Sequence, residues 1–485
     1  MPSTSFTTMP GTRNGTRPEG LRFLFTTLGH VESDFYGRVG AELRVLGHEA
    51  VHITFSRRGA SVLRRRGFEA RCLADAMDGI LEGVDVDAEV QRISAKYPTT
   101  TFRDIYRTDF VHDGRSEAWA VRRTVAHMLA LESLIDSLRP DILIPEVGNE
   151  TIRVATHLIG LQRGLPVFFL LYTIFDEPLR LYVDSMHALI VEPHDIKALT
   201  SVQRAEVEDF IARFMSRAEP IRPYRDRRPT AHRARMLARH LLVRALWDRN
   251  NDYLTPIHWL LGRGKEAVRA RLLRRYYEQL GKDRRYVYFP LHVTDDYKIK
   301  RVIPHCADQA SIIEQVARSL PHGYDLVVKE HPMAIGRTPC ALIRRLHRSR
   351  NIRVVAPRTS SHDLIRDAVG VAVISSTVGL EALLYNKPVL TLGQPFYSQL
   401  GLTVDVFSFA DIPRAVPQLL ERTVDPEHVM RFLHAAMQRC LPGAPVAVDR
   451  SDENARTLAR SLAEAAVTEV GRRRATAPDP STVRS

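Results

Sequence analysis

Short apolar segments of strand length alternate with segments of helical periodicity in two separate parts of this 485-residue chain. Helices that separate consecutive strands allow those strands to pair in parallel, with helices covering both faces of the sheet. The pattern therefore predicts an α/β fold of two Rossmann-type, doubly wound parallel-sheet domains that face a central cleft. The predicted strands are residues 21–27, 48–55, 140–146, 166–171 and 188–193 in the first part, and 286–291, 325–330, 352–357, 371–376 and 388–393 in the second.

The chain is longer than a single hydrophobic core usually supports, which also favours two domains. Between the two strand-rich parts the sequence is helical and basic, with few strand signals. The predicted order is a flexible leader at 1–20, an N-terminal domain at 21–194, a basic helical linker at 195–280, a C-terminal domain at 281–450, a closing helix at 451–470 and a disordered basic tail at 471–485.

Two classes of protein are disfavoured by simple patterns. No uninterrupted apolar run approaches the length of a transmembrane helix, and the polar N-terminus lacks the apolar stretch of a secretory signal. The four cysteines lie far apart and form no CxxC pair, which is typical of a reduced intracellular protein. We therefore expect a cytoplasmic location.

The formal charge of +13 is concentrated in one segment, since residues 222–275 contain 15 Lys/Arg and 4 Asp/Glu. Leucines at helical spacing in this segment could place it on an anionic membrane surface, at the inner face of the cytoplasmic membrane. The alternative, weighted equally, is that they pack on the domain interface. Nucleic acid is not expected, because no nucleic-acid-binding motif accompanies the charge. The residues concerned are Leu237, Leu241, Leu242 and Leu246, with Trp247, Trp259 and Tyr276 nearby.

Polar residues follow three predicted strands of the second domain, where open parallel sheets bind ligands. His292 with Asp295 and Asp296 follows the first strand, and the run 329–332, "KEHP", follows the second. Hydroxyl residues at 375–377 follow the fourth. These three strand ends are expected to line one site.

The hydroxyl run predicts a phosphate site. Ser375, Ser376 and Thr377 precede a helix, where backbone N–H groups, hydroxyls and the positive helix end converge. Gly379 is expected to admit a ligand closely, and the Glu381 carboxylate to accept hydrogen bonds from ribose hydroxyls. Taken alone, the run is more often a simple helix cap.

The "KEHP" run adds a second polar strand end facing the same crevice. His331 can donate a hydrogen bond to a phosphate, and Pro332 fixes the backbone so that the strand cannot continue as a helix. Lys329 and Glu330 should point to opposite faces of the strand, so at most one of them lines the cleft. Together, the two strand ends favour phosphate binding over helix capping.

The stretches "YVYFPLHV", "DLVVKEHPMAIG" and "ISSTVGLEALLYNKPVLTLGQPFY" resemble the capsule polysaccharide biosynthesis family, over about residues 285–400. This family consists of GT-B glycosyltransferases that include the bacterial capsule β-Kdo transferases. The resemblance implies an N-terminal acceptor domain and a C-terminal nucleotide-sugar domain. It also implies phosphate contacts from His331, Ser375, Ser376 and Thr377, and a ribose contact from Glu381. The first domain matches less well, since it lacks the expected glycine-rich first loop.

Sugar transfer also needs a base for the acceptor hydroxyl, expected from strand ends of the first domain. No metal site is predicted, because no DxD motif follows a strand. No cofactor is expected beyond the donor itself, either CMP-Kdo-like or a UDP-sugar. The base candidates, among which the sequence does not choose, are Glu32, Asp34, Glu146, Asp176, Glu177 and, from the second domain, His292.

Other functions remain open at this stage. A CDP-glycerol-type glycerophosphotransferase and a sugar-nucleotide 2-epimerase use the same kind of nucleotide site. A membrane-associated scaffold that has kept a nucleotide cleft would show neither transfer nor donor hydrolysis. The partners predicted for the favoured reading are a nucleotide-sugar donor and a polysaccharide or lipid-linked acceptor.

Overall fold

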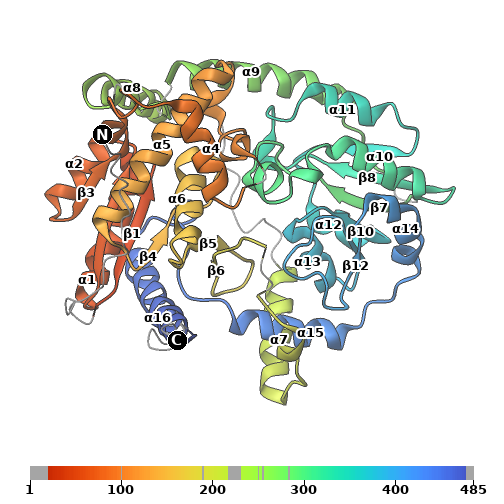
Figure 1. Ribbon diagram of the computed structural model, residues 1–485. Helices are drawn as coiled ribbons and strands as arrows, with labels where there is room; N and C mark the ends of the chain where they lie inside the picture. Colours follow the sequence, from red (N-terminus) through yellow and green to blue (C-terminus); the bar gives the residue numbers. More distant parts are fainter. Residues whose placement is uncertain are drawn as a thin grey trace.

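The computed structural model describes residues 20–99, 101–187, 190–216, 231–248, 251–253, 256–281 and 284–476. Two α/β domains lie side by side, each built around its own parallel sheet (Figure 1). The predicted fold class, two Rossmann-type domains, is therefore confirmed. The predicted leader lies outside the described residues except for Gly20.

The N-terminal sheet has the strand order β3-β2-β1-β4, with every pairing parallel. A parallel bridge between Leu143 and Val167 extends it toward β5. This order, with the first strand in the middle, is that of a Rossmann half-sheet. The strands are β1 (Arg22–Thr27), β2 (Glu49–Thr54), β3 (Glu69–Cys72), β4 (Ile142–Ile144) and β5 (Phe168–Tyr172).

The C-terminal sheet has the order β12-β11-β10-β7-β8-β9, again entirely parallel. It is doubly wound, and β10 lies directly beside β7, with Val371 opposite Tyr288. Their carboxyl ends therefore meet at one edge, which brings His292 and Ser375 together. The strands are β7 (Arg285–Pro290), β8 (Tyr324–Lys329), β9 (Ile352–Val355), β10 (Gly370–Val373), β11 (Val389–Thr391) and β12 (Val404–Asp405).

Alternating apolar side chains divide each sheet into two buried faces. In β1, Phe23 and Phe25 belong to one core cluster while Leu24 belongs to the other. In β7, Val287 and Phe289 lie on the face opposite Tyr286 and Tyr288. The helices that cover these faces include α1 (His30–Val45), α2 (Arg57–Arg65), α3 (Leu73–Met77), α4 (Val86–Lys96), α5 (Glu117–Leu138) and α6 (Thr151–Gln162) in the first domain, and α10 (Gln309–Ser319), α11 (Cys340–His347), α12 (Ser361–Asp367), α13 (Thr377–Leu384), α14 (Ile412–Glu421) and α15 (Pro426–Gln438) in the second.

The chain crosses between the domains more than once. Phe210 and Phe214 of α7 (Ser201–Ser216) pack with Phe432 of α15 in the core of the C-terminal domain. At the other end, α16 (Asp452–Thr476) returns to pack on α1, and its Leu462 is fully buried there (Figure 1). Thus α7, predicted as part of a linker, is a packing element of the C-terminal domain.

Four sequence predictions about strands and ends need correction. Residues 179–183 form β6 (Leu179–Val183), which pairs antiparallel with β5 and so departs from the all-parallel prediction. Residues 190–193 form no strand, and 188–189 lie outside the described part. The short strand β3 was not predicted. Helix α16 continues to Thr476, so the first six residues of the predicted disordered tail are helical.

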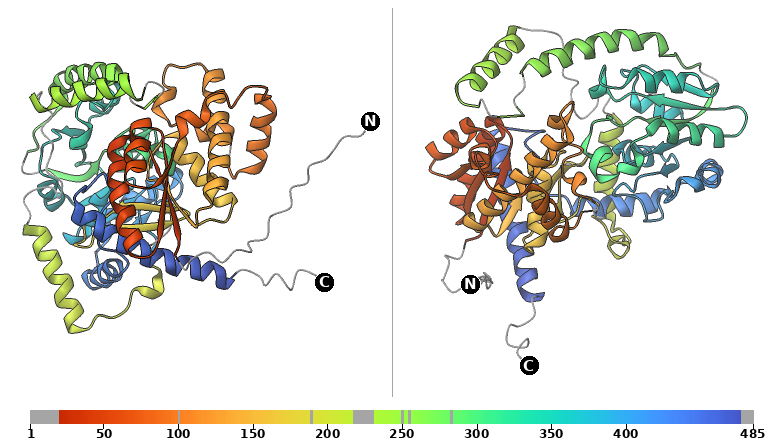
Figure 2. Two further views of the ribbon diagram at one scale, coloured as in Figure 1. Left: turned by 90° about the vertical axis from the view of Figure 1, so that its left-hand side faces the viewer. Right: turned by 45° about the horizontal axis from the view of Figure 1, so that its top comes forward.

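The basic segment forms two helices, α8 (Ala231–Leu246) and α9 (Pro256–Leu273), which run from the first domain toward the second (Figures 1 and 2). Ser56 Oγ donates to Asp248 Oδ2 at 2.7 Å and ties the end of α8 to the first domain. At the other end, the backbone of Glu266 lies so close to Gly336 that no side chain would fit there. Helix α9 therefore rests on the loop that begins with His331.

We expect Leu462→Ala to destabilise the N-terminal domain by about 2–5 kcal/mol, because it leaves a cavity between α16 and α1. Val467 lies on the same helix but is 56% exposed, so Val467→Ala is the matched control and should change the free energy of unfolding by less than about 0.5 kcal/mol. Urea unfolding of both variants measures the difference. Equal effects would show that α16 does not pack as described.

Candidate functional site

The start of α13 is the first part of the site. Residues 375–377 follow β10, and Ser376 caps the helix by accepting a hydrogen bond from the backbone N–H of Val378 at 3.2 Å. The capping role considered from the sequence thus belongs to one of the three hydroxyl residues. The hydroxyl of Ser375 has no hydrogen-bond partner within the described parts of the chain, so it remains available to a ligand at the positive end of the helix.

His292 joins the end of β7 to this helix start. Its Nε2 accepts a hydrogen bond from the backbone N–H of Ser375 at 3.1 Å, so the ring proton lies on Nδ1. Burial lowers the pKa of His292 to about 3, and the charges of Lys298 and His331 lower it further. The ring is therefore neutral. It is held by Gln309, whose side chain bonds the backbone N and O of His292 at 3.0 and 3.2 Å. A neutral, clamped imidazole is suited to positioning and donating a hydrogen bond rather than to carrying charge.

Lys298 is a site residue that was not predicted. Its Nζ lies 3.5 Å from the carbonyl oxygen of Ser375. Burial, together with the nearby charge of Arg180 and against the opposing charge of Asp296, lowers the pKa of Lys298 to about 8. Arg180 comes from β6 of the other domain, is 5% exposed, and its Nε has no hydrogen-bond partner in the described chain. A half-buried and a buried cation therefore lie close to each other beside the start of α13.

In the "KEHP" run, the side chains of Lys329 and Glu330 lie on opposite sides of the strand. Lys329 donates to Ser361 Oγ at 2.6 Å, and burial lowers the pKa of Lys329 to about 8, with Glu381 opposing the shift. Glu330 instead accepts a hydrogen bond from Tyr277 Oη at 2.5 Å, and burial raises the pKa of its carboxyl. The two side chains therefore part as the strand alternation predicted. Lys329 is the one near α13.

His331 lies at the exit of β8. Its Nδ1 accepts a hydrogen bond from the backbone N–H of Met333 at 3.0 Å, which leaves the ring proton on Nε2. Pro332 begins a short 3₁₀ turn, Pro332–Ala334, that ends the strand as expected. A proton gained by His331 would lower the pKa of His292, so the two histidines lie near each other. The structure thus brings the second and third predicted strand ends to the first.

Gly379 requires a correction. A Cβ at this position would overlap Tyr397 Oη, whose hydroxyl donates to the carbonyl of Ser376. The space beside this glycine therefore belongs to Tyr397, and the prediction that it admits a ligand is wrong. Glu381, one turn along α13, accepts a hydrogen bond from Thr377 Oγ1 at 3.4 Å. Burial raises the pKa of Glu381 to about 7. A carboxyl whose pKa lies near neutral pH is present in both protonation states, and either state can hydrogen-bond sugar hydroxyls.

Among the base candidates of the N-terminal domain, Glu146 differs from the rest. It follows β4 with a left-handed φ of 61°, is 3% exposed, and its Oε1 has no hydrogen-bond partner in the described part of the chain. Burial raises the pKa of Glu146 to about 8, Arg153 opposes the shift and Glu32 adds to it. A buried carboxyl with one oxygen lacking a partner, at a strand end and in a strained backbone conformation, is typical of a functional residue.

The other candidates are held in ion pairs. Glu32 pairs with Arg153 at 3.1 Å and accepts a hydrogen bond from the N–H of Leu28. Asp34 pairs with Arg66 at 2.8 Å on the outer side of α1. Another base candidate, Asp176, pairs with Arg213 of α7 at 2.8 Å, and Glu177 is exposed beside it. These ion pairs disfavour Glu32, Asp34 and Asp176 as the base, and the exposure of Glu177 leaves its carboxylate in solvent.

The two sets of polar residues face each other across the domain interface. Asn149 Nδ2 donates to the carbonyl of Asp295 at 3.1 Å, which joins the loop after β4 to the loop after β7. Arg301 Nη1 donates to the carbonyl of Gly148 at 3.3 Å. The loop that carries Glu146 therefore lies against the segment that carries His292 and Lys298.

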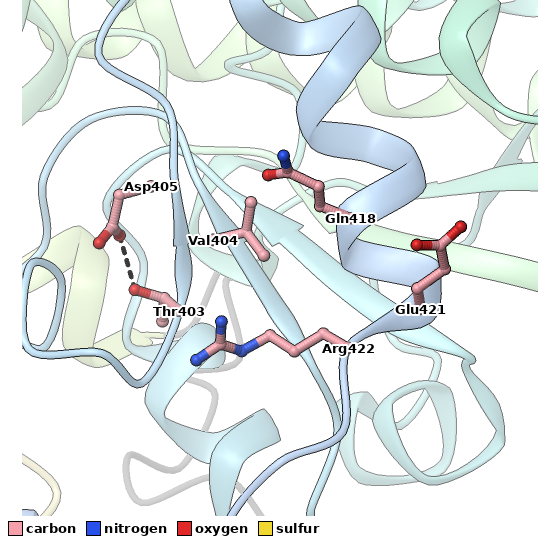
Figure 3. Close-up of a pocket in the computed structure, with 6 residues that line it drawn as sticks. All are labelled: Thr403, Val404, Asp405, Gln418, Glu421 and Arg422. Atoms are coloured by element: carbon pink, nitrogen blue, oxygen red, sulfur yellow. Dashed lines mark hydrogen bonds between the residues drawn. The ribbon is translucent and has the colours of Figure 1, made fainter.

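An open depression of about 480 Å³ lies elsewhere, at the outer edge of the C-terminal sheet between β12 and α14 (Figure 3). The Asp405 carboxylate in it already accepts hydrogen bonds from Thr391, Thr403 and the N–H of Gln399. The depression is thus a structural corner away from the strand ends. Its lining residues are Thr403, Val404, Asp405, Gln418, Glu421 and Arg422.

Possible metal ligands were also compared in space. Across the described ranges, no group of three or more His, Cys, Asp or Glu side chains is placed to hold a metal ion. The positive groups beside the start of α13 are the side chains of Lys298 and Arg180 and the backbone N–H groups of the helix.

The sequence of the second domain can now be compared with known proteins. Residues 248–424 match the family of capsule polysaccharide biosynthesis proteins. The resemblance predicted over about 285–400 is therefore confirmed, and this capsule-family segment contains His292, Lys298, His331 and the start of α13. A curated relative, the capsule polysaccharide export protein KpsS of Escherichia coli, is 33% identical over 129 residues, which cover 25% of this chain and 33% of that protein. The chain thus matches about a third of that relative's length.

Two solved structures are similar at low identity. The beta Kdo 2,7 transferase of Thermosulfurimonas dismutans KpsC is 17% identical, with 67% of this chain and 88% of that chain covered and a TM-score of 0.31. The UDP-GlcNAc 2-epimerase of Neisseria meningitidis is 13% identical, with 93% and 99% covered and a TM-score of 0.26. At such TM-scores these alignments carry no argument, and the fold assignment rests on the strand orders of this chain.

Lys298, Arg180 and Arg301 are the site residues that sequence reasoning missed. Lys298 and Arg301 lie in "DYKIKRVIP", only six and nine positions after His292, so distance from a strand end was a usable signal. Arg180 carried none, because its strand was not predicted and it reaches the site from the other domain.

Lys298 makes anion binding depend on pH. It is protonated below its pKa of about 8, so we expect the affinity for CMP to fall as pH rises through 8 toward 10. In Lys298→Met the affinity should be about tenfold lower at pH 7 and should lose this decline. Isothermal titration across pH 6.5–10 measures both.

The stability of the ligand-free protein should change with pH in the direction opposite to the affinity for CMP. Because the folded pKa of Lys298 lies below the value of 10.5 in an exposed lysine, its burial costs stability at neutral pH, and that cost disappears as pH rises above 8. Lys300→Met, on the same helix, is the control and should keep the pH dependence of CMP binding. A wild-type affinity that does not change between pH 7 and 10 would contradict the role of Lys298.

Proposed function

We propose that this protein is a glycosyltransferase that moves a sugar from a nucleotide-activated donor onto a capsule or other surface polysaccharide or glycolipid acceptor. The observation that carries the proposal is the convergence of His292, Lys298 and the start of α13 around Ser375, within the capsule-family segment. Such an arrangement binds a phosphate. A nucleotide phosphate is the leaving group in this class of reaction.

The C-terminal domain supplies the charge that the leaving group needs. As the bond from the sugar's anomeric carbon to the phosphate oxygen breaks, negative charge collects on the phosphate. Lys298 and the neutral His292 both contact the backbone of Ser375 at the start of α13, which supports a site that needs little reorganisation to accept that charge. We propose that stabilisation is metal-independent, because these groups provide cations and donors themselves.

The donor proposed is CMP-Kdo-like or a UDP-sugar. The half-buried Lys298 and the buried Arg180 are two cations in addition to the helix start, which favours a donor with more than one anionic group. A CMP-linked sugar acid has a phosphate and a carboxylate, and a UDP-sugar has two phosphates. Both meet the same requirement.

Glu146 is the proposed base. It takes the proton from the acceptor hydroxyl as the oxygen attacks the anomeric carbon, the nucleotide leaves with the bonding electrons, and the proton remains on Glu146. Its pKa of about 8 makes it a stronger base than an ordinary carboxylate. The loop contacts at Asn149 and Gly148 hold it on the side of the interface that faces the donor domain.

We expect Glu146→Gln to lower kcat for sugar transfer about 10²- to 10⁴-fold, the range of general-base catalysis, while nucleotide binding is retained. In the wild type, kcat/KM should rise with pH up to about 8, because the base must be deprotonated. Asp34→Asn removes another carboxylate of the same domain and should leave kcat unchanged. Transfer is measured with radiolabelled CMP-Kdo or UDP-sugars and an extracted capsule-glycolipid acceptor.

The same assay distinguishes the alternatives. Transfer of phosphoglycerol from CDP-glycerol would show a glycerophosphotransferase, and conversion of a UDP-sugar to its epimer without acceptor would show an epimerase. Nucleotide binding without turnover of any donor would show a scaffold. Each of these outcomes would overturn the glycosyltransferase proposal.

We further propose that the protein is cytoplasmic and attaches peripherally to an anionic membrane surface through α8 and α9. In the described helices none is long and apolar enough to cross a bilayer. Leu241, Leu242 and Leu246 are 45–59% exposed, which disfavours the alternative that they pack on the domain interface. The side chains of Leu237 and Trp259 lie outside the described ones. Exposed neighbours are Arg235, Arg239, Lys265, Arg269 and Arg271.

Replacing Arg235, Arg239, Arg269 and Arg271 by Gln should abolish flotation with vesicles of phosphatidylglycerol and phosphatidylcholine. Each basic side chain near such a surface contributes about 1 kcal/mol to binding. The control replaces Arg366, Arg431, Arg456 and Arg460, which do not lie on these helices, and should float like the wild type. Equal flotation of all three proteins would contradict a membrane role for α8 and α9.

A further inference from the structure

One short segment of the C-terminal domain, residues 292–303, touches both halves of the proposed site. Its centre is a π-helix, η5 (Lys298–Val302), in which the N–H of Ile303 donates to the carbonyl of Lys298 at 2.8 Å. Ile299 and Ile303 are buried in the core of their own domain and anchor the segment there. π-Helices are rare and recur at functional sites.

On the donor side, the segment contacts both the backbone N–H and the backbone carbonyl of Ser375. His292 Nε2 accepts from the N–H of Ser375, and Lys298 Nζ lies 3.5 Å from its carbonyl oxygen. An anion at the start of α13 would draw the ammonium of Lys298 toward itself. Donor binding therefore acts directly on the π-helix.

On the acceptor side, Arg301 crosses the domain interface. Its Nη1 donates to the carbonyl of Gly148 at 3.3 Å, and its Nη2 to Nδ1 of His157 at 2.9 Å. His157 Nε2 donates to the carbonyl of Asp184 at 2.7 Å, so Nδ1 carries no proton and must be the acceptor. Burial lowers the pKa of His157 to about 4, which keeps it neutral. Arg301 thus grips a loop carbonyl and a helix side chain at once.

The loop that Arg301 grips has little freedom. Gly148 lies against Glu150 and Arg153 so closely that a Cβ would overlap both side chains. Glu146, two residues earlier, is held in the left-handed region, and Asn149 is hydrogen-bonded to Asp295 of the same segment. Any displacement of Gly148 therefore moves the carboxyl of Glu146.

We propose that Arg301 is a positioning residue that ties the Glu146 loop to the donor-binding segment, so that occupation of the phosphate site sets the base in place. The inference rests on the proposed function. It makes the two substrates' sites interdependent, since the donor acts through Lys298 and the base responds through Arg301, three residues along one π-helix.

Arginine suits this task better than lysine. Burial lowers the pKa of Arg301 to about 10, yet the guanidinium stays charged at neutral pH, and its planar fork can donate to two acceptors at once. Hydrogen bonds from a charged donor to neutral acceptors are among the stronger ones. A lysine at this position keeps the charge but would bond only one of the two acceptors.

Hydrogen–deuterium exchange of the full chain, with and without CMP, tests the coupling directly. In the wild type, CMP should slow exchange both at residues 371–386 and at residues 145–157. In Arg301→Met, the first region should still be protected and the second should not. Lys300→Met, which removes a cation from the same π-helix, is the matched control and should behave like the wild type.

Transfer kinetics provide a second readout. We expect Arg301→Met to lower kcat about 100-fold, as small misplacements of catalytic groups do, with the dissociation constant for CMP unchanged. Arg301→Lys keeps the charge and is expected to recover part of that loss. It also serves as the second variant in case Arg301→Met does not fold. Protection of residues 145–157 by CMP in both Arg301 variants, with unchanged kcat, would overturn the coupling while leaving the proposed function standing. Absence of CMP protection anywhere in the wild type would overturn both.

Discussion

The hydrogen bond from the backbone N–H of Ser375 to Nε2 of His292 is the interaction on which the rest of the site depends. It joins the ends of two neighbouring strands, β7 and β10, and it requires a neutral ring. The low pKa that burial gives His292 meets that requirement at every physiological pH. This bond fixes the start of α13 against the β7 loop, the loop that leads to Lys298.

The charges of the proposed site are separated between the domains. The C-terminal domain gathers cations and N–H donors where a phosphate would leave, whereas the N-terminal domain holds a buried carboxyl, Glu146, whose pKa of about 8 suits proton removal. The proposed transfer would need both halves. Arg180 and Arg301, each reaching across from its own domain, make the two halves one polar network.

Helices that leave one domain and pack on the other hold the two domains together. Helix α7 leaves the first domain and packs in the core of the second, and α16 leaves the second and packs on the first. A chain that crosses in both directions restrains how far the domains can separate. The basic helices α8 and α9 connect the same two domains on another side, and α9 rests on the loop that begins with His331.

The alternation of apolar strands with helices determined the two parallel sheets, because that pattern is local and each strand carries it in its own residues. It also determined where polar side chains leave those strands, and so located His292, His331 and the run at 375–377. Only the tertiary structure revealed the antiparallel β6, the use of the space beside Gly379 by Tyr397, and the roles of Lys298, Arg180 and Arg301. It also singled out Glu146 from several carboxylates of similar sequence setting. These properties depend on which distant residues share a buried volume, since burial sets each pKa and leaves a polar atom with or without a partner, and spacing along the chain does not encode that.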